Sequence, residues 1–297
     1  MNVHQYLLLS IACALAVSGC SDGGSQQAAN GTPTPAPVLT PAPPGPSPTP
    51  TPTVTAYSPF ADFSLDRNFT GLVLASTTQT IPASVIYRDP DATTFSYRAA
   101  TQSFTRAYPN SQSTITPGVD GTTLAQTDAA LAYKYVIGTS DAFLTIHRNV
   151  GGAIYVGYIK DLENVKPIGF SGFTLAGAPT LALDLPVAGT TIYQATVVEI
   201  GAASAGQTVA VDASARRLSG TIAVTMNGGS APINLILDGV LDPQSGRVDG
   251  TVTTADGILK GAAHGRLYGP GGGEIGLIFD LKDSTGNASP GVLIGRK

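Results

Sequence analysis

The feature that most restricts the fold of this chain is a series of short segments, between residues 190 and 296, in which apolar and polar residues alternate. A period of two places apolar side chains on one face of a strand and polar side chains on the other. Leu218, Ile222 and Val224 share one face of such a segment, and Arg217 and Thr221 lie on the other. Turn residues separate the segments at roughly even spacing, which predicts an antiparallel meander. Its eight strands span approximately residues 190–200, 207–212, 216–226, 232–242, 246–254, 258–268, 274–281 and 291–296. That number is enough to close a small barrel filled by its own side chains.

The region before the predicted barrel, residues 56–185, is also expected to be rich in strands. Its runs of aromatic and β-branched residues favour strands at 93–98, 103–108, 132–137, 143–147 and 153–158. Residues 122–132, which include two adjacent alanines, are compatible with a short helical turn. The chain contains 35 Gly and 22 Pro, an excess that argues against an all-helical protein. The predicted fold class is therefore all-β.

The first twenty residues predict export. Residues 7–17 form an apolar stretch with the length of a signal-peptide hydrophobic region, too short to span a bilayer comfortably. The next residues, Val17-Ser18-Gly19-Cys20, resemble the lipobox of bacterial lipoproteins. This resemblance implies a signal peptide over residues 1–19, acyl chains such as palmitate on Cys20, and stable anchoring in a membrane. Ser21, after the cysteine, resembles a signal for sorting to the outer membrane. The alternative is an ordinary secretory signal followed by an incidental cysteine.

Residues 20–55 are predicted to be a lipidated cysteine followed by a Pro/Thr-rich linker. Ten of the 22 prolines fall between Pro33 and Pro52. Such a composition favours polyproline II at about 3.1 Å per residue, so some twenty residues would reach roughly 60–70 Å. The linker would hold the rest of the chain away from a lipid surface.

The end of the chain resembles the transferrin-binding protein B-like surface lipoproteins. Residues 265–279, Gly-Arg-Leu-Tyr-Gly-Pro-Gly-Gly-Gly-Glu-Ile-Gly-Leu-Ile-Phe, are similar to a strand–turn–strand motif near the end of those barrels. The residues that carry this similarity are Tyr268, Gly269, Pro270, Glu274, Gly276 and Phe279. Residues 185–193 and 291–297 resemble the first and last barrel strands of the same family. Leu277 stands where the family often has a second Gly, and Gly271–Gly273 replace its usual turn residues.

The resemblance implies an N-terminal β-rich handle-like domain at residues 56–185 and an eight-stranded β-barrel domain at residues 186–297. It also implies a cell-surface lipoprotein in the outer membrane of a Gram-negative bacterium. The family's implied partners are a protein or an iron- or haem-bearing cargo and a membrane transporter. This chain carries a single handle and barrel, whereas the transferrin receptors have two such lobes.

The motif itself has an explanation that needs no ligand, because Tyr268 and Phe279 flank a hairpin whose Gly-Pro-Gly run permits a sharp reversal. A phosphate-binding loop is excluded, since the Lys-Ser/Thr pair and the following helix are missing.

The sequence contains no grouping of residues that predicts catalysis, a metal site or a cofactor. Cys13 would leave with the signal peptide and Cys20 would carry lipid, so no thiol chemistry is expected. His147 and His264 lack the spacing of metal ligands. The net charge of −4 and the isoelectric point near 5.2 give no electrostatic reason to bind nucleic acid. We therefore expect no enzyme activity, no cofactor and no nucleic-acid partner.

The best candidates for ligand binding are aromatic and basic residues of the handle-like region: Tyr97, Arg98, Arg106 and Tyr108. Tyr and Arg are enriched at binding hot spots because each combines a large contact area with directed hydrogen bonds. The alternative is cross-strand aromatic packing beneath solvated arginines. The predicted function is capture of a protein or an iron- or haem-bearing cargo without catalysis. A structural or host-factor-docking lipoprotein with no iron-related cargo is the alternative.

Overall fold

The computed structural model describes residues 57–297 with several internal gaps. The gaps are residues 78–84, 89–92, 109–110, 116–120, 138, 164–169, 199, 204–205 and 227–230. The predicted lipidation site Cys20 and the predicted linker thus lie outside the described residues. Val54–Lys297 forms one compact unit. Every described strand and all three hydrophobic cores belong to this unit, so it contains the packing that it needs to fold on its own.

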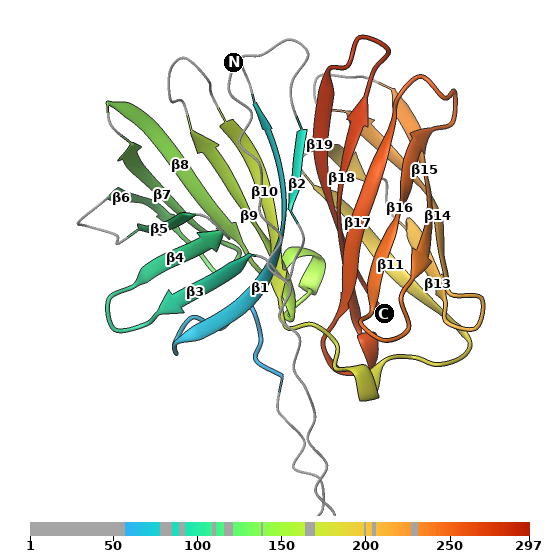
Figure 1. Cartoon of the computed structure of the whole chain (residues 1–297), viewed down its shortest axis with the longest axis horizontal. Coiled ribbons are helices and arrows are strands. Elements are labelled where there is room, and N and C mark those ends of the chain that lie inside the picture. The colour runs from blue at the N-terminus through green and yellow to red at the C-terminus, as the bar shows by residue number, and fades with distance from the viewer. Residues whose placement is uncertain are drawn as a thin grey trace, which may run out of the picture. The chain divides into compact units, whose positions relative to one another are not determined.

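The first half of the unit, here called the handle, is an antiparallel sheet of ten strands (Figure 1). Its strands are β1 (Arg67–Thr77), β2 (Val85–Arg88), β3 (Thr94–Arg98), β4 (Ser103–Tyr108), β5 (Ser111–Ile115), β6 (Gly121–Gln126), β7 (Ala130–Ile137), β8 (Ser140–His147), β9 (Val156–Glu163) and β10 (Phe170–Gly177). Their spatial order is β5-β4-β3-β1-β10-β9-β8-β7-β6, and β2 pairs with β1. The first and last strands of the handle, β1 and β10, are thus neighbours at its centre.

The handle corrects two expectations from the sequence. The helical turn considered at 122–132 is wrong: β6 and β7 occupy most of that segment, and Ala130 pairs with His147 of β8. Cross-strand pairing overrides the local preference of the two alanines. The last predicted strand of the handle starts later than expected, because residues Val150–Gly152 form a 3-10 turn, η2, ahead of β9.

The second half is the closed barrel that the sequence predicts. Its eight strands are β11 (Thr190–Val198), β13 (Thr208–Asp212), β14 (Arg217–Met226), β15 (Pro232–Leu241), β16 (Arg247–Thr254), β17 (Lys260–Tyr268), β18 (Glu274–Lys282) and β19 (Ala288–Arg296). Each pairs with its neighbour in sequence, and the β11–β19 pairing closes the ring. A short additional strand, β12 (Gly201–Ala203), pairs with β14. Two more 3-10 turns, η3 (Ala182–Asp184) and η4 (Pro270–Gly272), precede β11 and β18.

The interior of the barrel is filled by its own side chains, as the alternation predicts. Along β15, Leu235, Leu237 and Leu241 are buried in this core, whereas Ile236 and Val240 are exposed on the outside. Burial of each such side chain contributes about 1.5–3 kcal/mol. The barrel is therefore a solid packed element rather than a container.

Handle and barrel are joined by a core of their own. The outer face of β18 and β19 contributes Ile278, Val292 and Ile294 to this core, and the handle contributes residues such as Leu72 and Leu175. Strand β18 is consequently buried on both faces over almost its whole length. This core, here called the joint, fixes the barrel against strands β1, β9 and β10.

Candidate functional site: the handle edge and the joint

Tyr97, one of the four predicted ligand-binding residues, lies in the aromatic core of the handle. Its ring centroid is 4.8 Å from that of Phe63 and 4.7 Å from that of Phe104. Burial raises the pKa of its hydroxyl above the ordinary value. Phe95 stacks on Phe104 in the same cluster, with a centroid separation of 5.6 Å. Tyr97 thus takes the position that the cross-strand packing alternative describes, and its side chain is not available on the surface.

Arg98, the next residue, points out of the handle. Its Nη1 donates to Oδ2 of Asp66 at 2.8 Å, and the two side chains are 58% and 53% exposed. The hydrogen bond from Arg98, followed by one from the Ala99 amide, lowers the pKa of the Asp66 carboxyl. An exposed ion pair of this kind contributes little to stability, so Arg98 can form contacts with a partner at small cost. The side chains of Arg106 and Tyr108 lie outside the described part of the chain.

Glu274, from the motif in residues 265–279, connects the barrel to the handle at the joint. Glu274 is only 5% exposed, and its carboxylate accepts three backbone N–H bonds from the first residue of β9 and the two residues before it. The Ile154 amide donates to Oε1 at 2.7 Å, and the amides of Tyr155 and Val156 donate to Oε2 at 2.8 and 3.0 Å. Burial raises the pKa of this carboxyl, although the three N–H groups and nearby Arg296 act in the opposite direction. One side chain thus satisfies three donors of the other half of the unit.

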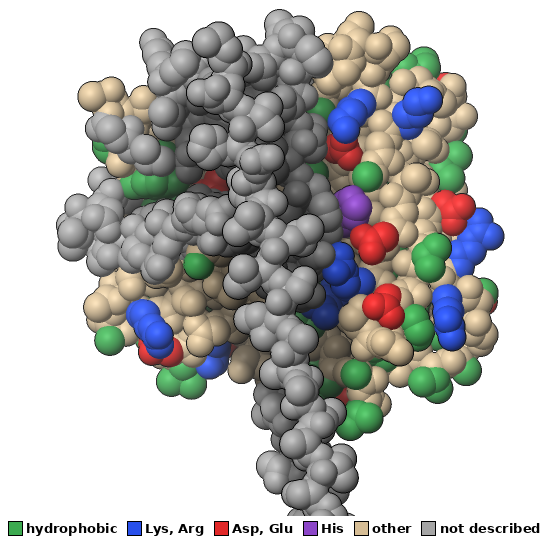
Figure 2. All heavy atoms as spheres, viewed as in Figure 1, with side chains coloured by type: hydrophobic (Ala, Val, Ile, Leu, Met, Phe, Trp, Pro, Cys, Tyr) green, Lys and Arg blue, Asp and Glu red, His purple; other side chains and the backbone are tan. Residues whose placement is uncertain are grey.

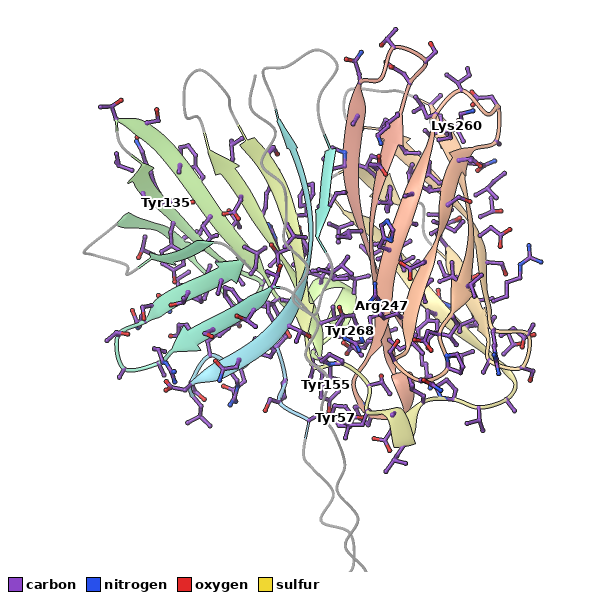
Figure 3. The ribbon with its side chains drawn as sticks, in the orientation of Figure 1. Tyr57, Tyr135, Tyr155, Arg247, Lys260 and Tyr268 are labelled. Carbon is purple, nitrogen blue, oxygen red and sulfur yellow. The ribbon has the colours of Figure 1, made fainter. Side chains whose placement is uncertain are left out.

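Tyr268 and Gly269 lie at the same place in the joint. Gly269 has φ 69° and ψ −177°, a conformation available almost only to glycine. A Cβ atom there would lie 2.5 Å from the ring of Tyr155. Tyr155 in turn meets the ring of Tyr57 edge to face at 6.0 Å. Figure 3 shows Tyr57, Tyr155 and Tyr268 grouped where the handle meets the barrel.

The remaining motif residues have different surroundings. Gly276 lets the two sheets approach closely, since a Cβ there would lie 2.8 Å from Leu175 of β10. Phe279 is buried inside the barrel, and Pro270 is exposed at the start of η4. Tyr268, Gly269, Glu274 and Gly276 therefore belong to the joint, and Phe279 belongs to the barrel core.

The segment that connects handle and barrel exposes apolar side chains. Leu183 is 99% exposed and Val187 is 89% exposed, and Leu181 is half exposed. The hydroxyl of Tyr57 donates to Asp184 at 2.6 Å and accepts from the Leu181 amide at 2.9 Å. The start of the described chain is thus held against this connecting segment. Clustered exposed apolar residues mark interaction surfaces in soluble proteins.

Described residues line several cavities. One of about 310 Å³ is lined by Lys160 and Phe173 of the handle and by Met226 of the barrel. A second, of about 550 Å³, lies at one end of the barrel beside Lys260 and Lys282. The third, of about 540 Å³, lies between handle and barrel.

The two histidines of the described chain lie in different sheets. His147 of β8 stacks on Tyr158 at 4.3 Å, and Nδ1 of His264 on β17 lies 2.8 Å from Oδ1 of Asp249. Within the described residues, no group of three or more His, Cys, Asp or Glu side chains could hold a metal ion. The same part of the chain has no helix with the length and apolar character needed to span a membrane.

Among known proteins, this chain is similar to several solved structures. The sequence matches no protein-family model and no curated protein. HpuA from Kingella denitrificans, solved in complex with human haemoglobin, aligns with a TM-score of 0.43 and 13% identity, covering 82% of this chain and 88% of its own. Transferrin binding protein B from Haemophilus parasuis aligns with a TM-score of 0.39 and 13% identity, covering 78% and 76% of the two chains. The same protein from Neisseria meningitidis gives a TM-score of 0.39 and 12% identity over 79% and 75%. These include proteins of the family that residues 265–279 resemble.

Sequence reasoning singled out the barrel side of the joint through the motif, but it did not find the handle residues that the motif meets. Tyr57 and Tyr155 carry no motif, and they lie 98 positions apart in the sequence. Arg266 was part of the recognised motif segment but was not identified as a candidate. The strand register shows that it lies opposite Arg247, a pairing of like charges that becomes visible only once the register is known.

Proposed function

We propose that this chain is a non-catalytic binding lipoprotein that captures a protein partner at the bacterial surface. The observation that carries the proposal is the position of the motif in residues 265–279. Tyr268, Gly269, Glu274 and Gly276 meet the handle, so the residues that resemble the family also create its characteristic handle-and-barrel lobe. A chance similarity in sequence would not be expected to coincide with the residues that join the handle to the barrel.

The kind of partner follows from the packed barrel. Because apolar side chains fill its interior, a small cargo such as haem would have to bind elsewhere or arrive on a protein. The similar structures include transferrin binding proteins and HpuA in complex with human haemoglobin, so transferrin and haemoglobin are the first ligands to test. Transfer of an iron- or haem-bearing cargo to a membrane transporter is the finer form of the proposal.

The partner surface is expected on the handle around Arg98 or on the connecting segment. The handle offers Arg98 and Leu65, which is 59% exposed, and the connecting segment offers Leu183 and Val187. Arg106 and Tyr108 of β4 stay candidates for ligand binding. Arginine is enriched at binding hot spots, and clustered exposed apolar side chains mark interaction surfaces.

The test is biolayer interferometry of Val54–Lys297 against human haemoglobin and transferrin, with a serum pull-down analysed by mass spectrometry. We expect saturable binding that is weakened about tenfold or more by Arg98→Ala or Leu183→Asp, the loss typical of a hot-spot residue. Arg217→Ala is a matched control, because Arg217 forms a similarly exposed pair with Asp238 on the barrel at 3.0 Å. Ile258→Asp provides the apolar control, since Ile258 is exposed in a barrel turn.

A blank against every serum protein would contradict capture. Capture of a protein without iron or haem would instead support the alternative, a docking lipoprotein with no iron-related cargo. Anchoring is tested separately by Cys20→Ser in the full chain, which should move the protein from the membrane fraction to the soluble fraction. Continued membrane association of that variant would contradict lipidation at Cys20.

A further inference from the structure

Two tyrosines and one arginine come together at the aromatic core of the handle. Tyr97 of β3 and Tyr133 of β7 both contact the ring of Phe104, with centroid separations of 4.7 and 5.4 Å. Each of these tyrosines is only 6% exposed. Phe63 lies 4.8 Å from Tyr97, and the guanidinium carbon of Arg148 lies 5.7 Å from the centre of the Phe63 ring. Strands from opposite sides of the handle thus bring these groups into one cluster.

The donors of this cluster lack acceptors within the described part of the chain. The hydroxyls of Tyr97 and Tyr133 form no hydrogen bond there. Arg148 donates from Nη1 to the carbonyl oxygen of Ala61 at 3.0 Å and from Nη2 to that of Thr127 at 2.9 Å, but its buried Nε has no partner. Buried polar groups in proteins are nearly always hydrogen-bonded, so three such donors in one place indicate a bound water molecule or ion.

The electrostatic effects on the two hydroxyls agree with this grouping. Burial, and secondly the neighbouring Tyr97 hydroxyl, raise the pKa of Tyr133 to about 12, while the charge of Arg148 acts in the opposite direction. Arg148 also opposes the increase in the pKa of Tyr97 that burial causes, and Asp66 adds to that increase. Both hydroxyls therefore stay protonated at neutral pH and remain hydrogen-bond donors.

Arg148 differs from two neighbouring arginines of the handle in what surrounds its charge. Arg67 forms an ion pair with Asp62, and Arg98 forms one with Asp66. Figure 2 shows basic side chains next to acidic ones at the lower edge of the handle. Arg148 instead meets two carbonyl oxygens and an aromatic ring, and no carboxylate of the described residues pairs with it. A half-buried charge of this kind favours a bound anion over a neutral water molecule.

We propose that the handle binds a small monovalent anion, such as chloride or the carboxylate group of a small acid, between the hydroxyls of Tyr97 and Tyr133 and the Nε of Arg148. Such an anion accepts from all three donors and compensates the charge of Arg148. Because Arg148 also holds Ala61 before β1 and Thr127 between β6 and β7, the anion would stabilise both segments against the handle. The site lies inside the handle, so it does not depend on the proposed capture of a protein.

The test is the melting temperature of Val54–Lys297 while sodium gluconate is replaced by sodium chloride or sodium formate at constant ionic strength. Screening is then unchanged and gluconate is too large for an internal site, so specific binding raises the melting temperature. Tyr97→Phe and Tyr133→Phe each remove one donor and keep the ring. Each should weaken anion binding about tenfold or more, the effect of losing a hydrogen bond to a charged group. Crystals grown in bromide locate the anion by anomalous scattering.

Tyr193→Phe is the matched control. The hydroxyl of buried Tyr193 donates to the carbonyl oxygen of Gly272 at 2.8 Å in the barrel, so this variant loses a hydrogen bond that needs no anion. It should lower the melting temperature equally in chloride, formate and gluconate. Either handle variant is sufficient for the test if the other fails to fold.

Three results would overturn the proposal. They are a melting temperature that responds to neither chloride nor formate, a response that persists unchanged in both handle variants, and the absence of a bromide peak beside Arg148. A response that is lost in the handle variants and kept in Tyr193→Phe would support it. A response to formate alone would identify a carboxylate site, and a response to chloride alone would identify a halide site.

Discussion

Glu274 is the most informative residue to remove from the joint. Its buried carboxylate is the acceptor for the N–H groups of Ile154, Tyr155 and Val156. Glu274→Ala deletes both oxygens and leaves these donors without their acceptor in a buried place. Each buried donor left unsatisfied costs about 1–3 kcal/mol, and water that enters the space recovers part of that cost. We expect the free energy of unfolding to fall by about 3–5 kcal/mol, the sum for three such donors less the part that water recovers.

The assay is amide hydrogen exchange by NMR combined with thermal unfolding. A loss of 3–5 kcal/mol corresponds to roughly 100- to 4000-fold faster exchange at Ile154, Tyr155 and Val156. For a unit of this size the melting temperature should fall by roughly 6–20 °C. Glu274→Gln keeps one acceptor oxygen and should lose less. Asp238→Ala removes an exposed carboxylate on the barrel and should cost no more than about 1 kcal/mol.

One pattern of results would refute this reasoning. If Glu274→Ala changed exchange at the three amides no more than Asp238→Ala does, the carboxylate would not hold the handle against the barrel. The same conclusion would follow if exchange accelerated evenly over both sheets with no excess at the start of β9. In either case the packing of the joint core, rather than Glu274, would be responsible for docking.

Two further predictions concern the backbone and the pH dependence of stability. Gly269→Ala should lower the free energy of unfolding by about 1–3 kcal/mol through backbone strain, and further through the clash of its Cβ with Tyr155. Gly257 also has a positive φ but no atom within 4 Å of its would-be Cβ, so Gly257→Ala should cost only the strain. Thermal melts of both variants measure the difference. Hydrogen bonds from Thr285 and Asn287 hold the pKa of Asp283 at about 2, below the ordinary 3.8. Its stabilising contribution is therefore present above pH 3.8 and lost as the pH falls toward 2, so urea unfolding of Asp283→Asn should depend less on pH in that window.

The strands that the sequence predicted best are those with one face in a core and one in solvent. Along β15 the buried Leu235 and Leu237 alternate with the exposed Ile236, and the predicted and observed bounds differ by one residue. Among the handle strands that it did not predict, β1 and β10 lie at the centre of the sheet. Residues 172–177 of β10 are all buried, because one face packs in the handle and the other against the barrel. Burial on both faces removes the alternation on which the prediction relied.

The candidate binding residues also show what could not be predicted from the sequence. Tyr97 and Arg98 are adjacent and were grouped by composition, yet one lies in the aromatic core and the other is exposed beside Asp66. Two consecutive residues of a strand necessarily face opposite sides. The alternation over residues 93–98 indicates that Tyr97 and Arg98 face opposite sides of the strand. Which side is buried depends on packing against Phe63, which lies more than thirty residues earlier.

The sequence by itself determined the all-β class, the number of barrel strands and the side chains that fill the barrel. These properties depend on alternation within ten residues and on turns between neighbouring strands, which are local. Only the tertiary structure decided that Glu274 binds amides some 120 residues earlier, and that Arg266 shares a cavity with Asn68. These contacts form only when the two sheets pack against each other. That packing depends on the shapes of both sheet surfaces together, and no single segment of the chain determines it.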